Sequence, residues 1–164
     1  MATARPVIRV PVHWLSPDGS QSSHPVNGEP CIKVGISFQS PVAEGKQLRL
    51  NAITWAYALL DTGAQWNLVE EKLVHERQSP ALETLTNHGA TGSATITNHA
   101  VALFLKGTPD DLIHNTGAGT IDLSARKVPW RMILGRKFLQ TTRFSYNSTQ
   151  GIKEIELIQD PNIV

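Results

Sequence analysis

The amino-acid sequence predicts an all-β protein. Short segments of alternating or continuous apolar residues recur along the chain, as β-strands require. Glycine, proline and polar residues separate these segments, and apolar residues at helical spacing are confined to short stretches. With 164 residues, of which 40% are hydrophobic, the chain is long enough to bury a core. We therefore expect one all-β domain over residues 1–164, with one or two short helices.

The first half of the chain contains the predicted N-terminal strands. Residues 7–15 alternate well enough for a first strand, and residues 16–30 read as a long polar loop rich in serine, glycine and proline. Residues 32–38 alternate cleanly and predict a half-buried strand. Apolar β material follows over residues 48–60.

A helix is expected after this strand. Asn67 is a candidate N-cap, and Glu70 stands three residues later, as in a capping box. The helix should end near Arg77, because Pro80 cannot continue it.

The second half of the chain predicts two hairpins and a long loop. Residues 89–93, Gly-Ala-Thr-Gly-Ser, form the expected tip of the first hairpin. Residues 106–129 are expected to be loop, with one short strand near 120–123. An apolar strand follows over 130–134, and a second hairpin is expected over 143–158.

The bulk composition excludes several classes of function. A net charge of +1, with fifteen scattered lysines and arginines, gives no electrostatic footprint for nucleic acid. No apolar run is long enough for a membrane span, and the N-terminus lacks the apolar core of a signal peptide. The single cysteine, Cys31, cannot form an intrachain disulfide and is expected to be a buried apolar residue. These features predict a cytoplasmic protein that binds neither nucleic acid nor membrane.

The most informative motif is Leu59-Leu60-Asp61-Thr62-Gly63-Ala64. A carboxylate at the end of a buried apolar strand is costly to ionise unless specific groups surround it. A glycine two residues later allows a tight turn, and the threonine hydroxyl can hydrogen-bond a neighbouring loop or chain. This pattern suits a catalytic acid at the floor of a cleft, although Asp-Thr-Gly also suits an ordinary turn.

A second motif lies about seventy residues later. The segment 130–139, Trp-Arg-Met-Ile-Leu-Gly-Arg-Lys-Phe-Leu, is an apolar strand that ends in glycine and leads into a helical turn. The order of the Asp-Thr-Gly strand, the glycine-tipped hairpin and the Ile-Leu-Gly-Arg strand resembles the retroviral-type aspartic proteases, the retropepsins. The resemblance covers residues 31–147. The N-terminal strand and loop of residues 1–30, the long 106–129 segment and residues 148–164, which hold the last hairpin strand and a tail, exceed the viral domain and make a cellular or bacterial member the closer match.

The resemblance implies a fold, a reaction and a set of site residues. The fold would be a β-barrel with a flap hairpin, active as a two-fold homodimer without a cofactor. Catalysis would rest on Asp61, with Thr62 linking the two loops across the dimer and Gly63 contacting the substrate backbone. The residues expected to contact the peptide or protein substrate are Ala64, Gly89, Ala90, Thr91, Gly92, Ser93 and Ile133.

The chemistry of the reaction independently requires a second acid. Two neighbouring carboxylates cannot both ionise, so a pair holds one proton and can act as base and acid together. The other aspartates stand in polar or turn-like surroundings: Asp18, Asp110, Asp111, Asp122 and Asp160. The second carboxylate is therefore expected from another copy of the chain, related by a two-fold axis.

The sequence departs from the viral pattern beside the second motif. The arginine after Ile-Leu-Gly pairs, in the viral enzymes, with an acid shortly after the Asp-Thr-Gly-Ala loop, but Gln65 stands in that place here. Arg136 is left with Glu70, Glu71 or a group of the partner chain, or is simply exposed. Lys137 also replaces the acid or amide that is common there. These departures bear on the dimer interface more than on catalysis.

Several other features are assigned ordinary roles. No histidine, cysteine or acid spacing predicts a metal site, and His88 beside the hairpin tip is expected to be a surface residue. Residues 115–118 repeat Thr-Gly-Ala with asparagine in the place of the acid, and they are expected to be a glycine-rich loop. Ile96, Trp66 and Met132 could line a substrate pocket or pack in the core.

Three hypotheses for function follow. The first is an aspartic endopeptidase active as a homodimer. The second is a peptide-binding or regulatory module of the same fold, which holds peptides without cutting them. The third is a structural all-β domain that carries the motif by chance, and it predicts a monomer that is insensitive to changes at Asp61.

Overall fold

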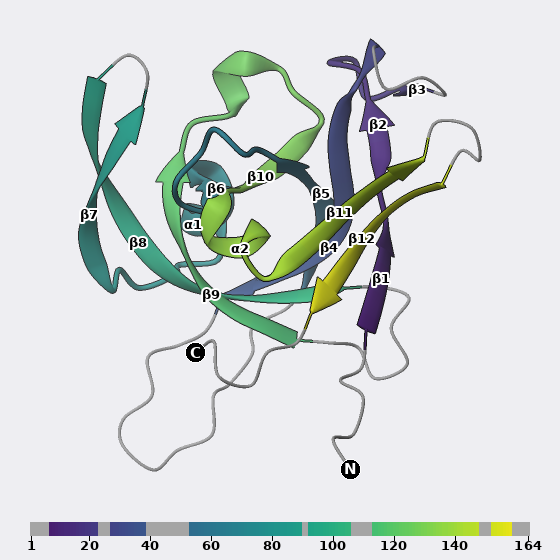
Figure 1. Ribbon diagram of the computed structural model, residues 1–164. Helices are drawn as coiled ribbons and strands as arrows, with labels where there is room; N and C mark the ends of the chain where they lie inside the picture. Colours follow the sequence, from purple (N-terminus) through teal and green to yellow (C-terminus); the bar gives the residue numbers. More distant parts are fainter. Residues whose placement is uncertain are drawn as a thin grey trace, which may run out of the picture.

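The computed structural model describes residues 7–22, 27–38, 53–89, 92–105, 113–147 and 152–158, and it is mostly β-sheet (Figure 1). The all-β prediction is confirmed. The strands are β1 (Val7–Pro11), β2 (His13–Leu15), β3 (Gln21–Ser22), β4 (Glu29–Phe38), β5 (Thr54–Leu60), β6 (Leu68–Glu70), β7 (Glu83–Gly89), β8 (Gly92–Leu105), β9 (Ile113–Ile121), β10 (Trp130–Leu134), β11 (Thr142–Asn147) and β12 (Ile152–Ile158). The helices are α1 (Glu71–Glu76) and α2 (Arg136–Leu139), with a 3₁₀ turn at Ser124–Arg126.

The larger sheet closes on itself. Its strand order is β3-β2-β4-β5-β10-β6-β9-β8-β7, and β4 also pairs with β8. The second pairing joins Val34 to Leu105 and Phe38 to Val101, so six strands from β4 to β8 form a ring. β10 lies in the middle of this ring, parallel to β5 on one side and antiparallel to β6 on the other.

The smaller sheet combines the two ends of the described chain, in the order β1-β12-β11. The predicted C-terminal hairpin is confirmed as the antiparallel pair β11 and β12. The predicted strand over residues 7–15 divides at Val12, since β1 joins the smaller sheet and β2 joins the larger one.

Two apolar clusters form the core. The larger one combines residues of both sheets and includes Val34, Leu103 and Met132. The smaller one contains Leu68, Trp130 and Ile133. Because successive residues of β10 point to opposite faces, this strand contributes to both clusters and is buried on both sides.

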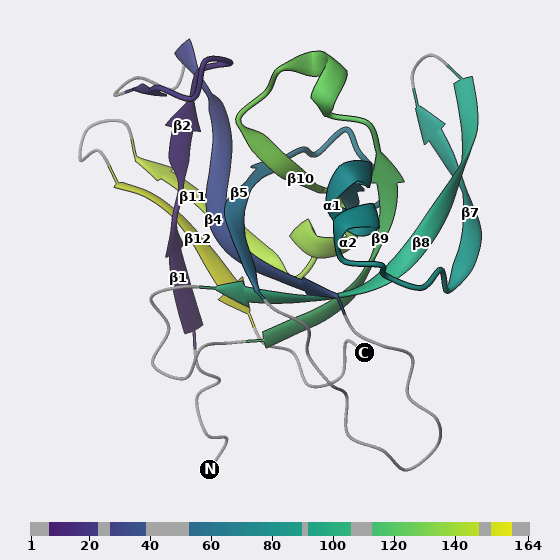
Figure 2. The same ribbon diagram turned by 180° about the vertical axis from the view of Figure 1, so that it is seen from behind.

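The helices are short and pack onto the sheet. α1 packs against β6 and β9, and α2 lies against β10 and β11 (Figures 1 and 2). The buried side chains of Leu73, Val74 and Phe138 anchor them in the larger cluster. Neither helix of the described residues has the length and apolar character needed to cross a membrane.

The predicted N-terminus of the first helix was wrong. Residues 68–70 form β6, and the helix begins only at Glu71. Asn67 does not cap the helix, because its side chain is fully buried and hydrogen-bonds residues distant in the sequence. Tertiary contacts here override a local capping pattern.

The predicted loop over 106–129 was also wrong in part. Residues 113–121 form β9, including the 115–118 segment that was expected to be a glycine-rich loop. The glycines serve packing rather than turning: a Cβ on Gly117 would lie 2.9 Å from the Asn98 amide, and one on Gly119 would lie 2.2 Å from Cδ1 of Ile96. Residues 48–52 of the predicted apolar β segment and residues 106–112 of the predicted loop lie outside the described residues.

Candidate active site

The end of β5 places Asp61 at the start of a tight turn. Leu60 pairs with Leu134 in the parallel ladder of β5 and β10. Just beyond this pair, Asp61 N–H donates a hydrogen bond to the carbonyl of Leu134 at 3.0 Å. Gly63 N–H then donates to Asp61 Oδ1 at 2.8 Å, which orients the carboxyl group. Asp61 is partly exposed, whereas Thr62 and Gly63 are exposed. The turn therefore presents one carboxyl group and an exposed hydroxyl together.

Two other aspartates, Asp18 and Asp122, make a similar turn, but their carboxyl groups have an additional hydrogen-bond partner. Ser20 N–H donates to Asp18 Oδ1 at 2.9 Å, and Ser124 N–H donates to Asp122 Oδ1 at 3.0 Å. In both turns the serine hydroxyl also binds the carboxyl, and this hydrogen bond is the main cause that lowers the pKa of Asp18 and of Asp122. Gly63 occupies the serine position at Asp61, so the hydroxyl that binds the carboxyl in the other two turns is missing from this position.

The strand-to-helix junction 134–137 holds the Asp61 turn from behind. Arg136 N–H donates to the carbonyl of Ala64 at 2.8 Å, and Lys137 N–H donates to that of Gln65 at 3.3 Å. Gly135 fits against the same loop so closely that a Cβ there would lie 2.4 Å from the carbonyl oxygen of Trp66. The two sequence motifs therefore form one unit, as their order along the chain suggests.

Asn67 completes this unit and was not identified as a site residue from the sequence. Its Oδ1 accepts from Gly135 N–H at 3.1 Å, and its Nδ2 donates to Thr116 Oγ1 at 2.9 Å. Gly119 N–H donates to the backbone carbonyl of Asn67 at 2.9 Å. A buried amide must be hydrogen-bonded, so one side chain ties the turn to β9 and to the start of α2. The sequence feature that could have identified Asn67 is a polar amide within the otherwise apolar run Trp66-Asn67-Leu68-Val69.

The predicted hairpin is confirmed as β7 and β8, and it rises at the same end of the molecule as the loop after β5 (Figures 1 and 2). Gly89 pairs with Gly92, and Gly92 has the positive φ of 131° that favours glycine. Ala90 and Thr91 lie outside the described residues. His88 is exposed, as expected, and its Nδ1 lies 2.7 Å from Ser93 Oγ.

A cavity of about 430 Å³ lies beside Asp61. It is lined by Glu29, Pro30, Leu59, Leu60, Asp61, Thr62 and Trp130. Sequence analysis did not identify Glu29, Pro30 or Trp130 as site residues, because strand pairing brings them next to the turn.

The other residues expected to contact substrate, where the structure describes them, are not among those that line this cavity. Ile133 is buried in the smaller apolar cluster with Trp130, and Ala64 packs against that cluster. Ile96 of the hairpin packs against it too, while Met132 belongs to the larger core cluster. Trp66 is partly buried, with the Lys137 ammonium 5.2 Å from the centre of its ring.

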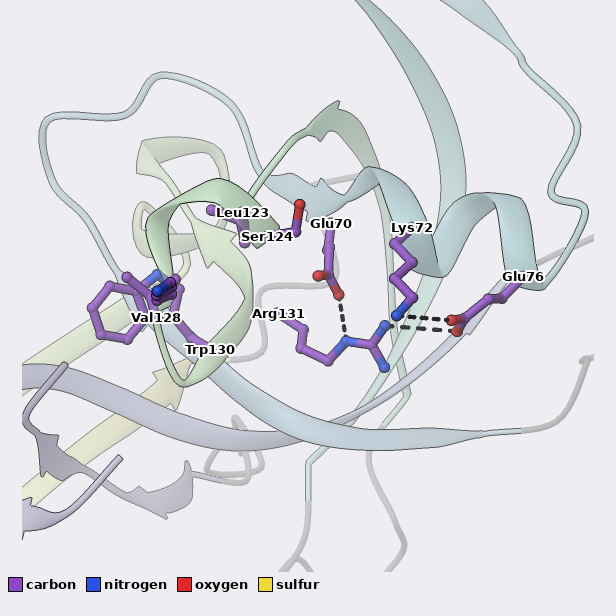
Figure 3. A pocket seen from close by; sticks show the side chains of 9 residues that line it. Glu70, Lys72, Glu76, Leu123, Ser124, Val128, Trp130 and Arg131 are labelled. Atoms are coloured by element: carbon purple, nitrogen blue, oxygen red, sulfur yellow. Dashed lines mark hydrogen bonds and ion pairs between the residues drawn. The ribbon is translucent and has the colours of Figure 1, made fainter. Parts of the chain in front are cut away.

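A second cavity of about 310 Å³ shares Trp130 with the first and contains an ion-pair network (Figure 3). Arg131 pairs with Glu70 and lies 3.7 Å from Glu76, which is 3.9 Å from Lys72. Glu70 is thus engaged by Arg131 and is not left for Arg136. Glu71 lies 3.5 Å from His75, and the side chain of Arg136 is exposed, which was one of the expected outcomes. The charges of this cavity largely satisfy one another, which indicates a structural role.

In the described part of the chain, Cys31 and the histidines show no arrangement typical of a nucleophile or metal site. Cys31 is fully buried, and burial, helped by the negative charge of Glu29, raises the pKa of its thiol to about 12. Within the described residues, no group of three or more histidine, cysteine, aspartate or glutamate side chains is arranged to hold a metal ion.

His99 predicts a pH dependence of stability at the base of the hairpin. Its buried Nδ1 lies 3.0 Å from the carbonyl of Pro80, and burial lowers the pKa of His99 below its usual value of about 6.5, with the nearby His75 acting in the same direction. The unfolded chain therefore binds the proton more readily. The contribution of neutral His99 to the free energy of unfolding should be fully present above a pH of about 6.5. It should fall as the pH drops below this value, by at most about 1.4 kcal/mol per pH unit.

Urea unfolding of the wild type and of His99→Gln between pH 5 and 8 measures this effect. The variant should show a flatter pH profile, and the exposed His88→Gln should keep the wild-type profile. Identical profiles for all three proteins would contradict the assignment to His99.

No model of a known protein family matches this chain, and no curated protein matches it. A function is therefore inferred from the chemistry of the site.

Proposed function

We propose that the protein is an aspartic endopeptidase in which two copies of the chain each contribute Asp61 to one catalytic site. The observation that carries this proposal is the Asp61 turn itself. Its carboxyl group is oriented by Gly63 N–H, held from behind by the 134–137 junction, and placed at an open cavity next to the exposed Thr62. A turn that serves packing alone has no need of an oriented carboxyl beside a cavity.

The reaction follows from two carboxyl groups that share one proton. The ionised Asp61 takes a proton from a water molecule, which attacks the carbonyl carbon of the peptide bond. The protonated Asp61 of the other copy donates a hydrogen bond to the carbonyl oxygen and stabilises its developing charge. A proton then passes to the leaving amine. The two apparent pKa values of such a site belong to the pair.

The exposure of Thr62 and Gly63 supports a two-fold interface at this turn. A symmetric contact places the same residues of both copies against each other, so Asp61 meets its own equivalent on the axis. The Thr62 hydroxyl is available to donate across this contact. Glu29, the other acid of the cavity, lies on β4 and is not a partner in the hydrogen bonds described above for the Asp61 turn.

The hairpin β7–β8 is proposed to close over the substrate. An extended peptide would lie between the hairpin and the Asp61 turn and bind as an added strand. Closure would exclude water from the reacting bond. The hairpin and the loop after Asp61 both pack against the smaller apolar cluster, through Ile96 and Ala64 respectively.

Mixing two forms of the subunit tests this proposal. Wild-type protein is mixed with increasing amounts of Asp61→Asn protein at constant total concentration and allowed to exchange subunits. Cleavage of a denatured protein is measured between pH of about 4 and 7, the range in which one shared proton is expected. If each site needs two Asp61 side chains, the activity falls with the square of the wild-type fraction.

A linear fall would show that each chain works alone and would overturn the shared site. Cleavage should also be blocked by a statine-type transition-state mimic. A protein that binds peptides but cuts none under these conditions would instead be the peptide-binding module of the second hypothesis.

A further inference from the structure

One part of the wall of the cavity beside Asp61 is apolar. Pro30, Leu59 and Trp130 line it, and Trp130 is mostly buried against the smaller apolar cluster. Such a wall suits the methylene stem of a long side chain.

The charge of this cavity is entirely negative. Its two ionisable groups are the carboxyls of Glu29 and Asp61, and no lysine or arginine lines it. In the part of the chain that the structure describes, the ion pairs of glutamates involve residues 70, 71, 76 and 156, so Glu29 has no cation beside it. The neighbouring cavity differs, because its two glutamates are already paired with Arg131 and Lys72.

Strand pairing brings Glu29 and Asp61 to the same cavity. β4 and β5 are antiparallel, and their pairing ends with Cys31 opposite Leu59. Glu29 and Asp61 each lie two residues beyond that last pair, and both line the cavity. The effect of the Glu29 charge on the Cys31 thiol agrees with a carboxylate close to this end of β4.

We propose that Glu29 is a specificity-determining residue that selects a lysine or arginine side chain of the substrate, next to the peptide bond that is cut. The proposal rests on the endopeptidase function proposed above. The stem of the basic side chain would lie on Pro30, Leu59 and Trp130, and its cationic head would donate to the Glu29 carboxylate. Apolar contact alone discriminates weakly between side chains of similar length, so the charge supplies the preference.

A matched peptide pair tests the proposal. The two peptides differ only at one residue beside the cut bond, which is lysine in one and the uncharged norleucine in the other, and the pair is made for each side of the bond. For one of the two sides, the wild type should cleave the lysine peptide with a kcat/KM about tenfold higher than the norleucine peptide. Glu29→Gln should remove that preference, so that the two peptides are cleaved with similar kcat/KM. Glu71→Gln, a change at an exposed glutamate of α1, should keep the wild-type preference.

The remaining outcomes overturn the proposal or assign the failure elsewhere. Equal cleavage of both peptides by the wild type, or an unchanged preference in Glu29→Gln, overturns it. Loss of cleavage of both peptides in Glu29→Gln also overturns it, because Glu29 would then act in catalysis. If the wild type cuts neither peptide, the endopeptidase function fails, and binding of the same two peptides then tests the role of Glu29. Tighter binding of the lysine peptide by the wild type, lost in Glu29→Gln, supports this role. Equal binding of the two peptides overturns it.

Discussion

Replacing Asp61 by asparagine should lower kcat/KM for peptide cleavage by at least about a thousandfold, because an amide can neither accept a proton from water nor return one to the leaving amine. The fold should survive. The asparagine Oδ1 can still accept from Gly63 N–H, and the bond from Asp61 N–H to the Leu134 carbonyl uses only the backbone. We expect the free energy of unfolding to change by less than about 1 kcal/mol.

Asp122→Asn is the matched control for this experiment. Asp122 accepts from the N–H two residues later at 3.0 Å, in the same arrangement as Asp61, but it is exposed and does not line the cavity. The control should retain full activity. Circular dichroism and sedimentation of Asp61→Asn should match the wild type, and near-normal cleavage by this variant would end the proposal of an aspartic protease.

Replacing Gly135 by alanine should have the largest effect on stability among the changes considered. A Cβ at this position would lie 2.4 Å from the carbonyl oxygen of Trp66 and 2.8 Å from that of Ala64, and both are backbone atoms that cannot rotate away. The conformation of Gly135, with φ of −87°, is open to any residue, so the cost is steric. We expect a loss of about 3 kcal/mol in the free energy of unfolding, measured with urea, and a displaced Asp61 turn with little remaining activity.

Gly92→Ala separates this clash from a general effect of replacing glycine. Gly92 has φ of +131° but no atom within 4 Å of its Cβ position, so its replacement costs only backbone strain, about 1 kcal/mol. Equal losses for the two variants would mean that the contact of Gly135 with the Asp61 loop does not determine stability.

The parts of the fold that could be predicted from the sequence are those encoded by neighbouring residues. Alternation of apolar and polar residues identified the strand at 32–38 and both hairpins, since one face of each strand is buried. The apolar run into Asp61 identified the strand that carries the acid, and the glycine after it identified the turn.

The errors came from residues whose partners are far away in the sequence. Asn67 has the local pattern of a helix cap, but its side chain binds residues 49 and 68 positions later. Gly117 and Gly119 have the local pattern of a loop, but they lie in a strand that neighbouring side chains approach closely. Glu29 could not be assigned to the site, because the pairing of β4 with β5 is what brings this end of β4 to the cavity beside Asp61.

The position of β10 between β5 and β6 has a consequence for the order of assembly. The backbone groups of residues 134–137 that hydrogen-bond the Asp61 turn are synthesised about seventy residues after Asp61 itself. A nascent chain that ends before Trp130 therefore has the acid but lacks these contacts. Closing so long a loop is slow, and it makes this part of the molecule a late step in folding. An incompletely synthesised chain therefore lacks part of the arrangement that the proposed reaction requires.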